Sequence, residues 1–513
     1  MKKKFSLLPD IAGLLCLMIF GTMIALNGES ALEDADTLWH IKAGEVMIKS
    51  REILTRDIFS HTADSKEWTS HEWLSEIIMA ALYKTTGFPG LVTFFFLIVS
   101  LTFWILYKIL EEDYGLWPAL ICSITAFIFA KTHLLARPHI FSWLFGIISF
   151  AILIRGGKKL YLLPALMIPW SNMHGGFIIG LVLQGIFLAG SIAQKVEETS
   201  FSKTWENKKN FYSPALVLAL SILTTCINPF GYKLLFFPFK VSAPVFLSNI
   251  QEWRSVDFQK FRVFRIFVLT LILLLVSGKR RVPWTHNFLL VVFLNAALIF
   301  VRNISIAGMY LAPVFAAAIQ STGESLKRFL TRKPTAPNDP GLHLSLTSGP
   351  ITVAVICAIL LISSYLNGPL SELLKDRIKL PEKFSSNVVS FLESHNPKGK
   401  LFNEYSMGGL IIHEFGPKIK VFIDGRADMY GETIMEDYLK IVKLDNDVDE
   451  LLESYRINWV LFSESTALVR YLKVTGDWKE IYNDNRFSVL TRTNLLSDSL
   501  SPIVALQKGL IEP

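Results

Sequence analysis

The chain has 513 residues, of which 51% are hydrophobic and only 19% charged, and its mean hydropathy is +0.40. A soluble enzyme of this length is less apolar, so the composition excludes that class and predicts a multi-span membrane protein. The net charge of +7 does not indicate a nucleic-acid partner, because Lys and Arg are grouped in short runs between apolar segments.

Apolar runs of about the length of a membrane span follow one another along the first two thirds of the chain. The first has the basic start and apolar core of a signal sequence but only a weak cleavage site, so we expect an uncleaved helix. The runs lie near residues 10–28, 88–110, 116–131, 139–154, 160–171, 174–193, 213–227, 262–277, 283–301, 304–320 and 350–366. They predict a polytopic α-helical domain of about eleven spans over residues 1–367.

The basic residues predict the orientation of these spans. If the "MKKK" start is cytoplasmic, alternation places four further basic segments in the cytoplasm, as the positive-inside rule requires. These segments are residues 155–159, 195–209, 278–281 and 326–333. The odd number of spans then predicts a multi-pass inner-membrane protein whose C-terminus is extracytoplasmic.

The remaining residues, 368–513, are less apolar and mix helical and strand patterns. Helical periodicity is present at 387–395 and 447–455, and short β-rich runs occupy 418–424, 458–464 and 486–492. We therefore expect a small extracytoplasmic α/β domain.

The first outer loop, residues 29–87, contains two amphipathic helical patterns, one from Trp39 and one from Trp73. Their apolar faces comprise Ala43, Val46 and Met47 in the first, and Ile77, Ile78, Ala81 and Leu82 in the second. We expect both helices to lie on the membrane and to frame a cavity above the bundle.

Acidic residues of this loop are the first candidates for chemistry. Asp34 and Asp36 form a D-x-D directly after the first span, although Asp36 has the alternative of capping a helix that begins at Thr37. Glu72 has a similar alternative, a capping box with Thr69, and His71 lies beside it. The position of these groups at one membrane face favours a functional site, because ionisable residues at membrane depth are costly.

Histidine and arginine residues gather at the ends of later spans on the same expected face. They are His133, Arg137, His139, His174 and Arg302. Snorkelling to the membrane surface is the alternative explanation, but Arg302 lies at an outer helix end against the positive-inside preference, which predicts an anionic partner. Because Arg pairs bidentately with phosphate oxygens, we interpret the group as a phosphate site.

Several motifs together resemble the GT-C membrane glycosyltransferases, and in particular a bacterial family with little assigned biochemistry. These motifs are "DADTLWHIKAG", "HEWLSE", "ARPHIFSW", "NMHGGF", "INPFGYK", "EWRS", "RNISIA" and "GGLIIHEFGPKIKVFIDGRADMY". The resemblance covers nearly the whole chain. It implies a GT-C fold and transfer of a sugar from a polyprenyl phosphate or diphosphate carrier to a lipid, glycan or protein acceptor.

The resemblance also implies roles for individual residues. Asp36 or Asp34 corresponds to the first-loop acid, which acts as general base or binds a divalent cation. Arg137, His139, His133, Arg302 and His174 would stabilise the phosphate of the donor. If Mg²⁺ or Mn²⁺ takes part, Asp34, Asp36, His71 and Glu72 offer suitable ligands. The sequence lacks a "WWDYG"-type acceptor motif, which argues against peptide N-glycosylation.

Asp424 and Arg426 close the densest polar motif of the C-terminal region, at the end of the strand expected over 418–424. They either pair and hold the turn or contact the acceptor. No glycine-rich phosphate loop supports a nucleotide site.

Two other functions compete with glycosyl transfer, namely a flippase of lipid-linked glycans and a non-catalytic envelope scaffold. A flippase should show midplane charges and a two-fold repeat, and the sequence has neither.

Overall fold

A computed structural model of the protein describes residues 10–199, 209–242, 250–278, 282–331, 369–384 and 386–495. They group into two compact units. Unit 1 comprises the described residues of 1–31, 71–75 and 82–379, and unit 2 those of 32–70, 76–81 and 380–513. Most of the first outer loop therefore groups with the C-terminal residues. The domain boundary expected at residue 367 lies outside the described residues, as does the helix expected over 350–366.

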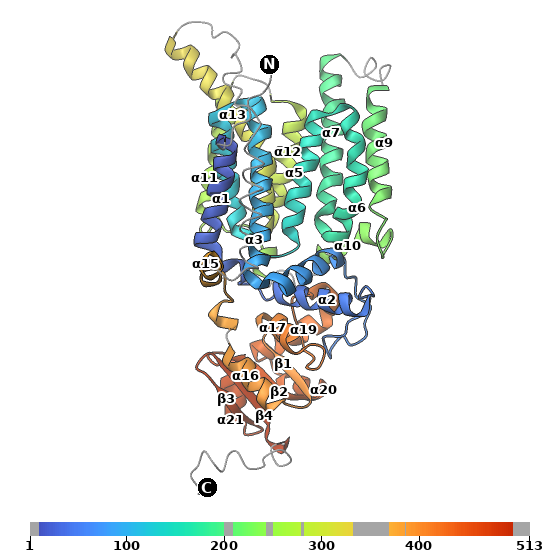
Figure 1. The fold of residues 1–513 in the computed structure, drawn as a ribbon, viewed down its shortest axis with the longest axis vertical. Coiled ribbons are helices and arrows are strands. Elements are labelled where there is room, and N and C mark those ends of the chain that lie inside the picture. The colour runs from blue at the N-terminus through green and yellow to red at the C-terminus, as the bar shows by residue number, and fades with distance from the viewer. Residues whose placement is uncertain are drawn as a thin grey trace. The chain divides into compact units, whose positions relative to one another are not determined.

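Most helices of unit 1 are apolar and run side by side as a bundle (Figure 1). The helices are α1 (Ile11–Asn27), α3 (Trp73–Tyr114), α4 (Leu116–Ala130), α5 (His139–Arg155), α6 (Leu163–Met173), α7 (Ile178–Glu198), α9 (Lys209–Thr224), α10 (Lys233–Ser242), α11 (Arg262–Ser277), α12 (Trp284–Ile299), α13 (Ile304–Thr331) and α15 (Pro369–Arg377). Single-turn helices precede several of them, including η2 (Lys131–His133), η4 (Gly175–Phe177), η6 (Gln251–Trp253) and η7 (Val301–Asn303). Each expected span within the described residues falls on one of these helices.

Four helical stretches in the described part of the chain are long and apolar enough to cross a membrane. They are Trp73–Tyr114, Leu116–His133, Gly175–Glu198 and Val301–Leu326, and shorter apolar helices include Ile11–Asn27 and His139–Arg155. The protein is an integral membrane protein, and the total of about eleven spans stays a prediction.

Helix α3 joins two elements that the sequence separates. It starts at Trp73, where the second amphipathic helix is expected, and continues to the end of the next expected span. A kink at Gly87, with φ of 64° and ψ of −166°, marks the junction, and Pro89 follows it. Glycine reaches this left-handed φ without the steric cost of a side chain, so the chain changes direction there without a loop.

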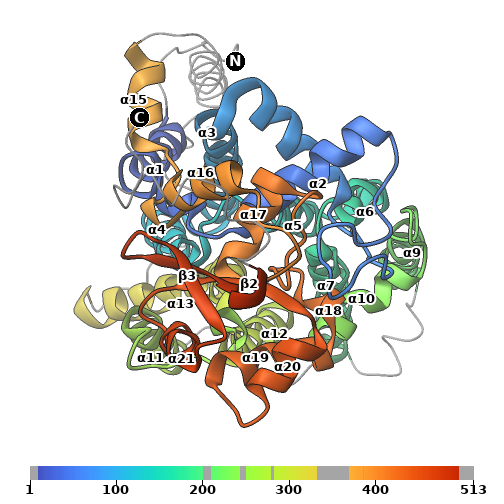
Figure 2. The same cartoon turned by 90° about the horizontal axis from the view of Figure 1, so that it is seen from below.

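Unit 2 contains a four-stranded sheet with the order β1-β2-β4-β3. The strands are β1 (Lys400–Asn403), β2 (Ile457–Ser463), β3 (Trp478–Asn483) and β4 (Phe487–Arg492), and β1 is parallel to β2 while the other pairs are antiparallel. The helices of the unit are α2 (Asp36–Ser50), α16 (Ser386–His395), α17 (Gly408–Phe415), α18 (Ala427–Tyr430), α19 (Glu432–Lys443), α20 (Val448–Ser454) and α21 (Ala467–Thr475). Figure 2 shows α19 and α20 side by side next to the strands.

The strand expected over 418–424 is wrong. Within this run, Val421 alone forms a β-bridge, an isolated parallel one to Ser60. The buried side chain of Asn403 takes the place of a neighbouring strand, because its amide donates to the Ile423 carbonyl at 2.8 Å and its Oδ1 accepts from the Phe422 N–H at 2.8 Å. The apolar run is therefore buried as an extended loop, whose backbone groups are satisfied by side chains and by the first-loop segment.

The first amphipathic helix is present as α2, but most of its apolar face is buried. Ala43 and Met47 are fully buried, and α2 packs against α17 within unit 2. Ala43 and Met47 are therefore not available to lipid, whereas Val46 of the same expected face is partly exposed, and the position of this helix on the membrane stays a prediction.

Candidate functional site

Asp34 and Asp36 have different roles at the start of α2. The Oδ1 atom of Asp34 accepts a hydrogen bond from the Asp36 backbone N–H at 2.9 Å, and the helix begins at Asp36 itself. Asp34 thus satisfies a donor of the first helical turn, and the idea that Asp36 caps a helix beginning at Thr37 is wrong. The Asp36 side chain is 9% exposed, and its Oδ1 accepts from Trp39 Nε1 at 3.0 Å.

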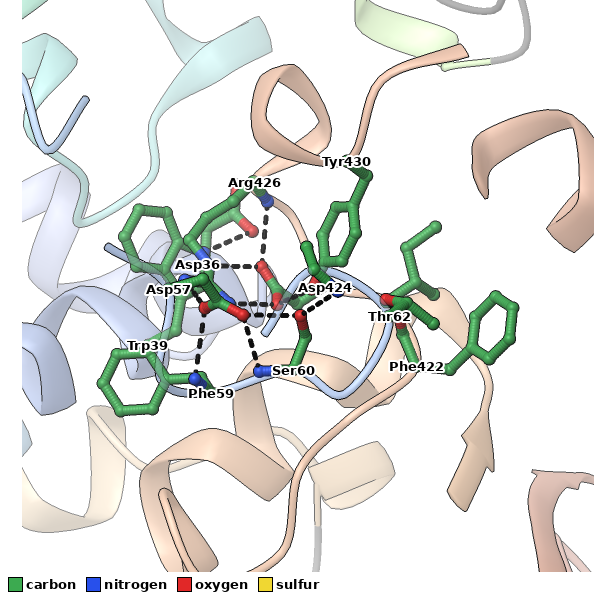
Figure 3. Close-up of polar contacts among 12 residues, drawn as sticks. Asp36, Trp39, Asp57, Phe59, Ser60, Thr62, Phe422, Asp424, Arg426 and Tyr430 are labelled. Carbon is green, nitrogen blue, oxygen red and sulfur yellow. Dashed lines mark hydrogen bonds and ion pairs between the residues drawn. The ribbon is translucent and has the colours of Figure 1, made fainter. Parts of the chain in front are cut away.

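A buried ionic network lies in the same unit and is centred on Arg426 (Figure 3). The guanidinium donates to Asp424 through Nε and Nη2, at 2.8 and 2.7 Å, and to Asp57 Oδ1 through Nη1 at 2.7 Å. The Tyr430 hydroxyl donates to Asp424 Oδ2, the oxygen that also accepts from Arg426 Nη2. All three charged side chains are at most 2% exposed, so each charge depends on its partners for the stabilisation that water would otherwise supply.

Asp57 connects this network to the first loop. Its carboxylate also accepts from the Phe59 N–H at 3.1 Å and from the N–H and hydroxyl of Ser60 at 2.9 and 2.6 Å. The loop in turn pairs with the 421–424 segment, since Thr62 donates to the Phe422 carbonyl at 2.5 Å. No motif in the sequence marks Asp57, because its partner lies 369 residues away.

Aromatic rings surround the Arg426 guanidinium on its remaining sides. Its Cζ lies 4.8 Å from the Trp68 ring centroid, 5.3 Å from that of Phe59 and 5.9 Å from that of Trp39. Burial by itself would lower the pKa of Arg426, but Asp424, Tyr430 and Asp57 together outweigh it and raise that pKa well above the usual value. Arg426 is therefore a permanent cation, and its Nε, Nη1 and Nη2 atoms each donate to a buried carboxylate. This favours the expectation that Asp424 and Arg426 hold the turn over contact with an acceptor.

A second buried pair in unit 2 was not among the expected site residues. His40 Nδ1 lies 3.1 Å from Glu76 Oε1, and Ser70 donates to Glu76 Oε2 at 3.0 Å. Each of these three side chains is 1% exposed. Glu76, the last residue of "HEWLSE", is the part of this pair that lies in a sequence motif. Its burial, however, depends on its contact with His40 in the first helix of the loop.

Glu72 is the central acidic group of unit 1. Helix α3 begins one residue later, with no side-chain bond at its N-cap, so the expected capping box with Thr69 is wrong. Instead, Glu72 Oε1 lies 3.5 Å from His71 Nε2 and 3.4 Å from His174 Nε2. The carboxylate therefore faces two imidazole rings.

The tautomer of His174 follows from its neighbours. The Gly176 N–H donates to its Nδ1 at 2.9 Å, and Ser142 Oγ, which accepts from Trp170 Nε1, lies 2.8 Å from the same nitrogen. An imidazole nitrogen that accepts an N–H carries no proton, so the proton of the neutral ring is on Nε2 and points to Glu72.

The pKa values of this pair shift in opposite directions. Burial raises the pKa of Glu72 to about 7, although Arg137 and Arg302 oppose the shift. Burial, together with the neighbouring histidines and the same two arginines, holds the pKa of His174 well below its usual value. Near neutral pH, Glu72 therefore exchanges a proton readily while His174 is a neutral N–H donor.

The residues expected to bind phosphate come from different helix ends of unit 1 and gather in one region. His139 Nε2 donates to the His133 carbonyl at 2.9 Å, and the rings of these two residues lie 4.4 Å apart. The His139 and His174 rings are 6.4 Å apart, and Arg137 and Arg302 act electrostatically on Glu72 and His174. The region thus combines two permanent cations with imidazole groups.

Glu252 is the anionic partner that the position of Arg302 predicts. Its Oε1 lies 3.4 Å from Arg302 Nη1 and its Oε2 lies 3.8 Å from His133 Nδ1, while the Arg302 guanidinium stacks 4.5 Å from the Trp253 ring. Burial acts to raise the pKa of Glu252, but Arg302 and Arg137 outweigh it and the pKa is lowered. Glu252 lies in the "EWRS" motif, but no sequence signal pairs it with Arg302, which is 50 residues away.

The four residues expected to hold a divalent cation fall in different units. Asp34 and Asp36 belong to unit 2, and His71 and Glu72 belong to unit 1. Within unit 1, His71 Nε2 and Glu72 Oε1 offer one nitrogen and one oxygen. His174 is a poor third ligand, because its Nε2 carries the proton in the tautomer that the Gly176 N–H selects.

No protein-family model matches the chain, and neither does any curated protein sequence. Its structure is similar to that of the Archaeoglobus fulgidus oligosaccharyltransferase in the apo form, with a TM-score of 0.51 and 10% identity, covering 88% of this chain and 69% of that chain. The same enzyme tethered to an acceptor peptide containing the NVT sequon gives 0.53 and 10%, covering 94% and 74%.

This chain has the GT-C fold. ArnT from Cupriavidus metallidurans bound to undecaprenyl phosphate, another GT-C protein, is 13% identical with a TM-score of 0.47, and the match covers 96% of this chain and all of that one. The similarity to the oligosaccharyltransferase confirms the GT-C fold expected from the sequence motifs. Identities this low establish the fold alone, so the chemistry has to be argued from the residues of the site.

The raised pKa of Glu72 predicts a pH-dependent stability. A carboxyl group with a pKa of about 7 in the folded protein, against 4.5 normally, favours folding in its protonated form. Ionisation of Glu72 therefore lowers the free energy of unfolding as the pH rises from about 4.5 to about 7. The loss reaches about 3 kcal/mol at most. Glu72→Gln, which stays neutral, should raise the thermal unfolding midpoint at pH 8 and leave it unchanged at pH 4.

Thermal unfolding in detergent with EDTA, at a series of pH values, measures this difference. Glu67→Gln, at an exposed position, is the matched control and should show no pH-dependent gain. Equal midpoints for Glu72→Gln and wild type across the whole pH range would show that the carboxyl group is not desolvated.

Proposed function

We propose that the protein is a glycosyltransferase that moves a sugar from a polyprenyl phosphate or diphosphate carrier to an acceptor at the outer face of the cytoplasmic membrane. The observation that carries the proposal is the cluster of unit 1, in which Arg137, Arg302 and His174 accompany the proton-exchanging Glu72. The GT-C fold, which this chain shares with an oligosaccharyltransferase, supports glycosyl transfer as the reaction class.

The reaction places defined demands on the protein. An acceptor oxygen attacks the anomeric carbon, the bond from that carbon to the phosphate oxygen breaks, and its electron pair stays on the phosphate. The acceptor proton must go to a base. Positive charge must stabilise the departing phosphate, because preorganised charge is the largest single contribution in such reactions.

Unit 1 contains candidates for stabilising the phosphate, and unit 2 contains a candidate for the base. In unit 1, we assign the phosphate to the guanidinium groups of Arg137 and Arg302 and to the Nε2–H of His174, with His133 and His139 beside them. Protonated Glu72 would not repel the phosphate, which is why its raised pKa suits this position. In unit 2, we assign the role of base to Asp36, since Asp34 is engaged at the start of α2.

A divalent cation is compatible with this assignment. In unit 1, His71 and the deprotonated form of Glu72 are the residues that would hold it. The cation would supply neutralisation of phosphate charge. Asp424 and Arg426 are assigned to holding the turn they form, because both are buried and paired. Residues other than Asp424 and Arg426 would then bind the acceptor, whether it is a lipid, a glycan or a protein.

The proposal is tested by mass spectrometry of lipid-linked and envelope glycans from cells that lack the protein. We expect one envelope sugar to be missing and its carrier to accumulate with the sugar exposed on the outer leaflet. Re-expression of the wild-type chain should reverse both changes. Accumulation restricted to the inner leaflet would indicate a flippase instead, and unchanged glycans would indicate a scaffold.

A further inference from the structure

The Asp36 carboxylate lies directly against the backbone of Gly425. A methyl group built on Gly425 would come within 2.9 Å of Asp36 Oδ2 and closer still to Oδ1. No side chain other than hydrogen fits at position 425 while Asp36 keeps its place. The contact brings the first-loop acid against the "DGRADMY" motif within unit 2.

Backbone conformation does not explain this glycine. Gly425 is absent from the described glycines with positive φ, so an alanine could adopt its backbone angles. The reason for glycine is therefore the space taken by the Asp36 carboxylate. A purely structural turn between Asp424 and Arg426 would tolerate alanine.

The turn that carries Gly425 is rigidly held on both sides. Asp424 Oδ1 accepts from the Arg426 N–H at 3.0 Å and from Arg426 Nε at 2.8 Å, which closes the turn around Gly425. Arg426 is in turn bonded to Asp57 at 2.7 Å. The surface on which the carboxylate rests is thus fixed by buried ion pairs (Figure 3).

Trp39 links the same network to Asp36 from the opposite direction. Its Nε1–H donates to Asp36 Oδ1 at 3.0 Å, and its ring lies 5.9 Å from the Arg426 Cζ. Asp36 is consequently held between an indole donor of its own helix and the Gly425 backbone. Such a frame restricts the carboxylate to one position, which is what a general base requires.

We propose that Gly425, in the turn locked by Asp424 and Arg426, is a positioning residue that sets the place of the Asp36 carboxylate for glycosyl transfer. This inference rests on the proposed function, because it assumes that Asp36 is the base. It assigns the C-terminal "DGR" motif to the reaction through Asp36, without contact between that motif and the substrate.

The test is a double-mutant cycle between Gly425→Ala and Asp36→Ala in the full-length protein. Thermal unfolding should show that Gly425→Ala lowers the midpoint when Asp36 is present and has little effect in the Asp36→Ala background. If the single variant cannot be purified, a folded double variant gives the same evidence. Equal effects in both backgrounds would overturn the contact.

The second measurement is the amount of the glycan missing from cells that lack the protein, expressed per mole of folded protein recovered. A merely structural role would leave this specific activity unchanged. We expect Gly425→Ala to reduce it by about 100-fold or more, since misplacement by about 1 Å has effects of this size. Gly323→Ala, where the added methyl group meets nothing within 4 Å, should keep wild-type activity.

The outcomes separate this inference from the proposed function. If Asp36→Ala loses activity and Gly425→Ala keeps it, the positioning role is wrong while the role of Asp36 stands. If Asp36→Ala keeps full activity, the assignment of the base fails, whatever Gly425→Ala does. Loss in both variants, with no further loss in the double variant, supports the inference.

Discussion

Arg426→Met should destabilise the protein by about 3–5 kcal/mol, because it leaves two buried carboxylates without their counter-ion. Asp57 and Asp424 are both fully buried, and the guanidinium is bonded to each at 2.7 Å. Methionine is chosen because it approximately retains the volume and the apolar stem of arginine. The change should appear as a large fall in the thermal unfolding midpoint and as faster proteolysis of the first loop.

The matched control is Arg486→Met in the same unit. Arg486 also forms an ion pair at 2.6 Å, with Glu382, but these side chains are 50% and 77% exposed. An exposed pair contributes about 0–1 kcal/mol, so the control should unfold close to the wild type. Similar midpoints for the two variants would mean that the buried Arg426 ion pairs contribute no more to stability than the exposed pair of Arg486.

Asp36→Asn should reduce glycosyl transfer by about 100-fold to 10,000-fold, the usual contribution of a general base. Asparagine keeps an Oδ1 that accepts from Trp39 Nε1, so the side chain should stay in place while it loses the ability to take a proton. Product formed by purified protein, or the envelope glycan restored in cells that lack the protein, measures the effect.

Asp64→Asn is the corresponding control, because the Asp64 side chain is 51% exposed and forms a surface ion pair with Lys420. It should retain transfer, and both variants should unfold at the wild-type temperature. Full activity of Asp36→Asn would remove Asp36 from the chemistry and would direct attention to the His40 and Glu76 pair of the same unit.

The helices of unit 1 could be predicted because a membrane span leaves a local signal. About 20 consecutive apolar residues are needed wherever the helix packs, so its place in the sequence follows from composition alone. The unexpected continuity of α3 through Gly87 arises because a kink and a loop leave similar Gly and Pro signals.

The C-terminal strands were predicted less well. The apolar run 418–424 has the composition of a strand, yet it pairs only through Val421, because Asn403 and the first loop already satisfy its backbone. Strand pairing depends on partners elsewhere in the chain, which propensity does not describe. The missed strands β1 and β3 have weak alternating patterns and form because β2 and β4 lie beside them.

By itself, the sequence determined that this is a membrane protein of many apolar helices, which residues are available for proton transfer and phosphate binding, and that the GT-C fold is the one to expect. Only the tertiary structure decided how those residues are used. Asp34 ends up at a helix start, His174 acquires one tautomer from the Gly176 N–H, and Arg426 is joined to an Asp57 that no motif marks. Hydropathy acts over neighbouring residues, whereas a protonation state or an ion pair depends on groups that meet only when the chain folds.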